Sequence, residues 1–237
     1  MATIHAHEHP VRDIFSDKFA FSIPSYQRPY SWGTDQADEL FSDLLTASEG
    51  FSAGGPPPKI GVTPYFLGSI VLIKSEQAPD ADVIDGQQRL TTLSLLLSAL
   101  RVCFDDHESK STFAKFLLEK GNNIVGTRDR CRLKLRDRDH EFYEENILRP
   151  DDLSTLGTLV NESLPDPQRK LCENTSSLIE KVAKLDPSRR EDLAAYLLQH
   201  TYLVVVATPD LDSAFRIFSV LNDRGLDLSA ADILKAE

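Results

Sequence analysis

Apolar and polar residues follow two periods along the first hundred positions. Alternation at Phe19, Phe21 and Ile23 predicts a short strand, and the run 65–74 (YFLGSIVLIK) is apolar and β-branched enough for a central strand. Leucines three and four positions apart after residue 89 predict a long buried helix. The predicted elements are a short helix and a strand over 11–23, a helix over 35–47 capped by Thr34, strands over 65–74 and 80–84, and a long helix over 87–104.

The rest of the chain is mainly helical before a strand returns. Residues 105–200 carry helical periodicity interrupted by glycines and prolines, and the run 203–208 (LVVVAT) has the pattern of a buried strand. Helices are expected over 212–221 and after Ser229, and the sequence stops inside the latter, so we expect a fragment of a longer protein. The predicted fold is α/β, with a nucleotide-binding core over 1–104, a mainly helical subdomain over 105–200, and a strand and helices over 201–237 that complete the core.

The turn between the strand at 80–84 and the long helix carries the densest candidate chemistry, Asp85-Gly86-Gln87-Gln88-Arg89. Glycine lets a ligand approach the backbone, and the helix start offers amide donors to an anion. Arg89 can bind a phosphate, while Asp85 can bind Mg²⁺ or accept a proton from water. The simpler interpretation is that Asp85 and Gln88 cap the helix and that Arg89 makes a surface ion pair. The phosphate loop G-x-x-x-x-G-K-[ST] is absent, so a nucleotide would be held by another architecture.

A second candidate is the polar and aromatic loop that follows Ile23. Arginine and flat aromatic rings suit stacking on a base or enclosing a soft, weakly hydrated group. The alternative is that the aromatic rings anchor the loop in the core. The residues concerned are Pro24, Tyr26, Gln27, Arg28, Tyr30 and Trp32.

Three weaker patterns remain. The histidines at positions 5, 7 and 9 suggest metal binding, but a disordered polar tail is the expectation. Cations at every second position over 130–138 would share one face of a strand and contact DNA phosphates, although neighbouring aspartates equally suit a solvated face. Asn222-Asp223-Arg224-Gly225 is explained by turn formation alone, yet Asn222 and Arg224 could face a ligand near Arg89.

Composition limits the functions that these motifs allow. The formal net charge of −11 argues against a general nucleic-acid coat, so any DNA contact must be local. Apolar runs are too short for a membrane span, and the start of the chain has no secretory signal, so a cytoplasmic protein without a membrane partner is expected. The three cysteines lack metal-site spacing and are expected to be reduced structural thiols.

Taken together, four motifs resemble one family. They are Ile23 to Trp32 (IPSYQRPYSW), Phe66 to Val71 (FLGSIV), Asp85 to Leu93 (DGQQRLTTL), and Leu221 to Gly225 (LNDRG) with Leu228, Asp232 and Lys235. The combination resembles the N-terminal, GmrS-like domain of GmrSD-type modification-dependent restriction proteins, including their phosphorothioate-sensing Ssp relatives. The resemblance spans nearly the whole chain.

The resemblance implies a ParB/sulfiredoxin-like mixed-sheet core that hydrolyses a nucleoside triphosphate, with GTP as the first candidate. It further implies that hydrolysis is coupled to recognition of modified double-stranded DNA. It also implies an HNH-type nuclease domain that is not in this sequence, and leaves the oligomeric state open. The expected site comprises catalytic Asp85, Gln88 and Arg89, with Asp85 also as a Mg²⁺ ligand; nucleotide-binding Gly86, Gln87, Gln27, Arg28, Asn222 and Arg224; and modification-sensing Pro24, Tyr26, Tyr30 and Trp32. The alternatives are a non-catalytic nucleotide or DNA switch and a purely structural interaction domain.

Overall fold

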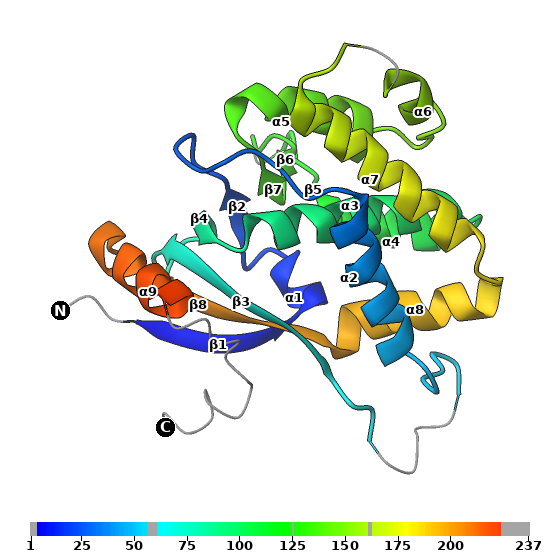
Figure 1. Cartoon of the computed structure of the whole chain (residues 1–237), viewed down its shortest axis with the longest axis horizontal. Coiled ribbons are helices and arrows are strands. Elements are labelled where there is room, and N and C mark those ends of the chain that lie inside the picture. The colour runs from blue at the N-terminus through cyan, green and yellow to red at the C-terminus, as the bar shows by residue number, and fades with distance from the viewer. Residues whose placement is uncertain (1–3, 56–60, 125, 161–162, 224–237) are drawn as a thin grey trace.

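The computed structural model describes residues 4–55, 61–124, 126–160 and 163–223. A mixed six-stranded sheet runs through the centre of the described chain (Figure 1). From one edge to the other it is formed by β1 (His5–Pro10), β8 (Thr201–Thr208), β3 (Tyr65–Lys74), β4 (Asp80–Asp85), β2 (Ala20–Ser22) and β7 (Leu133–Lys134). β3 pairs parallel with β8 and antiparallel with β4, and β4 pairs parallel with β2.

Helices cover both faces of the sheet because side chains on β3 alternate between two apolar clusters. Ile70 and Leu72 belong to the main core, which contains the leucines of α3 (Gln87–Cys103). Val71 faces the other way and packs with Ile84 of β4 and Ala214 of α9 (Leu211–Asp223). The remaining elements are α1 (Val11–Ile14), α2 (Thr34–Ala47), α4 (His107–Leu117), β5 (Leu118–Glu119), β6 (Arg130–Cys131), α5 (Asp137–Tyr143), the π-helix η1 (Glu144–Leu148), α6 (Leu156–Leu159), α7 (Asp166–Ala183) and α8 (Pro187–His200).

The structure confirms the α/β class and the main predicted elements. β3, β4 and α3 lie where their patterns predict, and the returning strand becomes β8, between β1 and β3. The long helix is buried on all sides, because α4 and α7 pack against it as well as the sheet. The cap predicted at Thr34 is displaced by one residue: Gly33 precedes α2, and its amide donates to Oε1 of Gln36 at 2.7 Å.

Two expectations are wrong. The three N-terminal histidines do not form a disordered tail, because residues 5–10 pair antiparallel with β8 along their whole length. The five cations of 130–138 do not share a strand face, because the chain changes partner. β6 pairs with β5, β7 pairs with β2, and α5 begins at Asp137. No helix in the described ranges is long and apolar enough to cross a membrane.

Candidate functional site

The site is built around a glycine turn between β4 and α3. Gly86 has a φ of 89°, a left-handed conformation that favours glycine. A Cβ atom at this position would overlap Cγ2 of Ile70 on the neighbouring strand β3. Gly86 also has no side chain with which to cap α3, so the amides of the first helical turn are available to an anion. The local sequence therefore ends a buried strand and starts a buried helix with a backbone that a ligand can approach.

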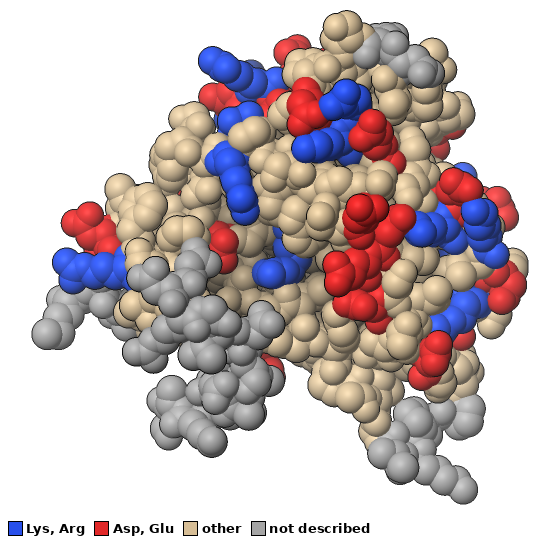
Figure 2. All heavy atoms as spheres, viewed as in Figure 1, with Lys and Arg blue, Asp and Glu red and all other residues tan. Residues whose placement is uncertain are grey.

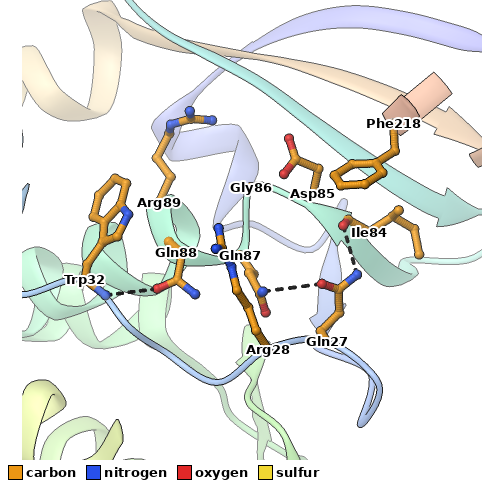
Figure 3. A pocket seen from close by; sticks show the side chains of 10 residues that line it. All are labelled: Gln27, Arg28, Trp32, Ile84, Asp85, Gly86, Gln87, Gln88, Arg89 and Phe218. Carbon is orange, nitrogen blue, oxygen red and sulfur yellow. Dashed lines mark hydrogen bonds between the residues drawn. The ribbon is translucent and has the colours of Figure 1, made fainter. Parts of the chain in front are cut away.

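This turn opens into a cavity of about 560 Å³ (Figure 3). The volume lies within the range of small-molecule sites. Arg28 extends from its loop toward the start of α3, with Trp32 and Arg89 on one side and Asp85 and Phe218 on the other (Figure 3). The lining residues are Gln27, Arg28, Trp32, Ile84, Asp85, Gly86, Gln87, Gln88, Arg89 and Phe218.

Two glutamines fasten the loop of residues 24–32 to the turn. Oε1 of Gln88 accepts from the amides of Ser31 at 2.8 Å and Trp32 at 3.2 Å, and its Nε2 donates to the Pro29 carbonyl at 3.0 Å. Nε2 of Gln27 donates to the Ile84 carbonyl at 2.9 Å, at the end of β4. Both polar atoms of Gln88 are thus bonded to the loop backbone, which makes Gln88 a positioning residue. The catalytic role predicted for it stays a prediction.

The aromatic residues of the loop have different environments. Tyr30 is buried, and its hydroxyl lies 2.9 Å from Oγ1 of Thr92 and 2.6 Å from Nδ2 of Asn174 on α7. Burial raises the pKa of Tyr30 to about 12, so this hydroxyl stays protonated. Tyr26 is 58% exposed and lies beside Phe215 of α9, with ring centroids 6.2 Å apart. The ring of Trp32 is half-buried at the cavity wall.

Arg89 is held by the backbone of β3. Its Nη1 donates to the Ser69 carbonyl at 2.9 Å. The guanidinium lies against Gly68, where a Cβ atom would come within 3.3 Å of Nη2. Gly68 has a φ of 92°, so the FLGS segment both bends and leaves room for the arginine. This arrangement fixes the direction of Arg89 at the edge of the cavity.

The second cavity arginine, Arg28, is exposed, and its side chain has no hydrogen-bond or ion-pair partner within the described ranges. Next to it lies a small cavity of about 10 Å³, also lined by Arg136 and Asp139. Arg136 pairs with the buried Asp139 at 2.9 Å and lies 3.5 Å from the Gln27 carbonyl. A cavity of this size holds about one water molecule.

Three other cations of the predicted stripe pair with carboxylates. Arg130 and Arg132 share Glu119, at 2.8 and 3.2 Å, and Lys134 lies 3.0 Å from Asp137. Arg132 also contacts Asp17. On the face of the molecule in Figure 2, lysine and arginine side chains are interspersed with aspartate and glutamate rather than gathered in one area.

The structure brings most of the predicted site together. All five residues of the DGQQR turn line one cavity with Gln27, Arg28 and Trp32. Pro24, Tyr26 and Tyr30 do not line this cavity. Asn222 lies in the last turn of α9, and Arg224 lies outside the described residues. The sequence did not predict that Ile84, Phe218 and Arg136 lie at the site. The apolar residues Ile84 and Phe218 indicated core packing, and Arg136 belonged to the alternating basic stripe.

The geometry defines a mixed α/β domain with a polar, arginine-bearing pocket at the carboxyl end of a strand. Comparison with protein families then identifies the kind of domain. The model of the GmrSD restriction endonuclease N-terminal domain matches residues 11–237, so the chain belongs to this family and has a restriction-related role. The resemblance carried by the four motifs is therefore confirmed. A search of curated proteins gave no match.

Proposed function

We propose that the pocket binds and hydrolyses a nucleoside triphosphate, with GTP the first candidate, and that this domain senses modified DNA in a restriction system. The observation that carries the proposal is the convergence of Arg28, Arg89, Asp85 and the start of α3 on one cavity of about 560 Å³. A triphosphate is a polyanion, and helix-start amides with two guanidinium groups supply the donors it needs.

In the proposed reaction, water attacks the γ-phosphorus and the bond to the β–γ bridging oxygen breaks, which yields a nucleoside diphosphate and inorganic phosphate. Asp85 accepts the proton of the attacking water; alternatively, Asp85 would be the residue that holds a Mg²⁺ ion, which would supply neutralisation of phosphate charge. Arg28 and Arg89 stabilise charge on the transferred group and on the leaving oxygen. Gln88 and Gln27 hold the loop so that Arg28 stays in reach, and Trp32 gives the base a flat surface.

The proposed DNA contact lies beside the pocket. Tyr26 and Phe215 present exposed aromatic surface from the loop and from α9, and the loop is bonded to the turn through Gln88. Binding of a nucleotide in the pocket can thus change the position of the loop that would contact DNA. The same change can be passed on to a nuclease domain of the HNH type. Tyr30 has no part in this proposal because it is buried.

Phosphate release from GTP and ATP with Mg²⁺ tests the catalytic proposal. Asp85→Asn and Arg89→Ala should each lower turnover by at least about 100-fold, the typical size of a lost catalytic group. Asp82→Asn is the matched control, since Asp82 is an exposed carboxylate on the same strand and does not line the cavity. Unchanged turnover in the Asp85 and Arg89 variants, with the fold intact, would remove the catalytic assignment.

A non-catalytic switch is the second candidate. It is favoured by the presence of a single carboxylate, Asp85, among the described residues that line the cavity, and by the full use of the Gln88 amide in holding the loop. This function predicts saturable nucleotide binding without phosphate release.

The DNA proposal is tested with three duplexes of one sequence: unmodified, phosphorothioated and base-modified. Sensing predicts tighter binding of one modified duplex than of the unmodified one, and a weaker preference in Tyr26→Ala. Equal affinity for all three over a range of salt concentrations would remove sensing from this domain.

A further inference from the structure

Three potential metal ligands converge away from the nucleotide pocket. Cys131 at the end of β6, His140 on α5 and Glu144 at the start of η1 each place one ligand atom within 4.8 Å of the other two. None of the three lines the cavity at Gly86. They come from a segment whose strands β5 and β6 are only two residues long.

The local structure explains why these side chains meet. His140 and Glu144 are four residues apart on the continuous helix formed by α5 and η1, so they project from the same side. Nε2 of His140 lies 3.5 Å from Oε2 of Glu144. The helix widens here, because the amide of Arg149 bonds to the Glu144 carbonyl five residues earlier at 3.0 Å. Such π-turns are frequent at functional sites. Cys131 is buried and approaches from the strand.

The polar atoms of the cluster are incompletely satisfied by protein groups. Nδ1 of His140 is buried and has no hydrogen-bond partner in the described part of the chain. Buried ring nitrogens without a partner are uncommon. The other ring nitrogen, Nε2, is the one that faces Glu144. Oε1 of Glu144 accepts from Nε of Arg149 at 2.8 Å, while its other oxygen faces His140. Arg149 therefore orients the carboxylate from outside, as outer-sphere partners of metal ligands do.

We propose that Cys131, His140 and Glu144 bind a zinc-like divalent cation, with water as the fourth ligand. Thiolate with imidazole suits Zn²⁺ and disfavours Mg²⁺ and Ca²⁺, which prefer oxygen ligands. Zinc–ligand bonds of about 2.0–2.3 Å place tetrahedral ligand atoms roughly 3.3–3.8 Å apart, so small side-chain shifts close the site. Binding forms a zinc–sulfur bond and releases the thiol proton to solvent.

Without a cation, the cluster is a thiol beside a carboxylate. Burial, and then the nearby Glu144, raises the pKa of Cys131 to about 12, so the thiol stays protonated. A cation would neutralise the two anionic ligands and join β6 to the helix. That helix also carries Asp139, which pairs with Arg136 beside Gln27. The site would thus stabilise one wall near the nucleotide pocket without taking part in hydrolysis.

The test is cation binding to the full chain after treatment with a chelator. One equivalent of Zn²⁺ should bind, measured by native mass spectrometry, and Co²⁺ in its place should give thiolate-to-metal charge-transfer absorption in the near ultraviolet. Cys131→Ser should abolish that absorption, and His140→Gln and Glu144→Gln should weaken Zn²⁺ binding by more than roughly 100-fold, beyond the loss of an outer-sphere partner.

The controls separate this site from other thiols and imidazoles. Cys103→Ser replaces a partly exposed thiol elsewhere and should leave binding unchanged. His7→Gln tests the histidines of β1 and should also have no effect. Glu144 is only partly buried, so Glu144→Gln should keep the fold even if Cys131→Ser does not. No binding by the wild-type chain, or binding that survives Glu144→Gln and is lost in His7→Gln, would overturn the proposal.

Discussion

Two regions of the molecule are rich in cations, and they differ in what those cations meet. In the stripe from Arg130 to Arg138, four of the five side chains pair with nearby carboxylates. In the proposed nucleotide pocket, Arg89 donates to a neutral carbonyl, and Arg28 has no ion-pair partner among the described residues. The stripe is the denser basic pattern in the sequence, but we expect the pocket to be the better anion site.

The difference teaches that anion affinity follows from where the countercharges lie. A guanidinium that already shares a carboxylate must lose that pair before it can bind a phosphate. The exposed pairs of Arg130 and Lys134 also contribute little to stability. In the pocket, the Gly86 turn and the Gln88 amide position the loop and the helix start, and Arg28 has no carboxylate partner among the described residues.

The largest effect is expected from Gly86→Ala. A left-handed alanine costs about 1–2 kcal/mol, and overlap with Ile70 adds roughly 1–3 kcal/mol. For a domain of this size the sum lowers Tm by roughly 5–15 °C, and nucleotide binding should be lost because the turn must move. Calorimetry and nucleotide titration measure both effects.

Gly50→Ala is the control for that substitution. Gly50 also has a positive φ, 78°, but a Cβ atom there meets nothing within 4 Å. We expect only the conformational cost and unchanged nucleotide binding. Normal nucleotide affinity in Gly86→Ala would show that the ligand binds elsewhere.

The next effect tests the pocket cation directly. Arg28→Ala should weaken nucleotide binding by about 10–100-fold, the equivalent of one charge-assisted hydrogen bond. Arg138→Ala removes another exposed arginine, which belongs to the stripe, and should leave nucleotide affinity unchanged. Titration with a fluorescent nucleotide compares the two. An equal loss in both variants would mean that net charge, rather than the pocket, governs binding.

A smaller effect is expected when two stripe cations each lose one carboxylate partner. Glu119 binds both Arg130 and Arg132, so Glu119→Gln removes one partner from each arginine and leaves the contacts with Asp80 and Asp17. Non-specific affinity for duplex DNA at low salt should rise roughly two- to fivefold. Glu108→Gln makes the same charge change at an exposed acid of α4 without an ion pair in the described structure, and should raise affinity less. Gel-shift titrations over a salt series resolve the difference.

The smallest effect belongs to Arg130→Ala. Its pairs with Glu119 and Asp80 are at the surface, so the free energy of unfolding should change by less than about 1 kcal/mol. Nucleotide affinity should not change. Chemical denaturation measures the first quantity, and a change well above that limit would mean that the stripe stabilises the fold.

Much of the fold was predictable because local pattern and tertiary environment agree. The segment YFLGSIVLIK lies between two strands that pair with it, and the buried leucines of α3 all belong to the main core. The turn at Gly86 was also predictable, since glycine readily adopts the left-handed conformation that a tight turn between a strand and a helix can require. The Asp85–Arg89 motif and the loop of residues 24–32 could be recognised as a site, although their bonding through Gln88 could not.

What was not predictable depends on contacts between distant residues. The alternating cations of 130–138 look like a strand, but pairing of β6 with β5 and of β7 with β2 divides them. Cys131, His140 and Glu144 follow no familiar ligand spacing and meet only because α5 returns beside β6. The histidines of β1 form a strand because β8, some two hundred residues later, provides its partner.

The place of β8 in the sheet has a consequence for synthesis of the chain. β1 and β3 are both made long before the strand that lies between them. On the ribosome, each therefore exposes a row of unpaired backbone groups until residue 208 has emerged, and contacts of such long range form slowly. Such open edges can pair with other chains, and the sheet closes only after β8 has been synthesised.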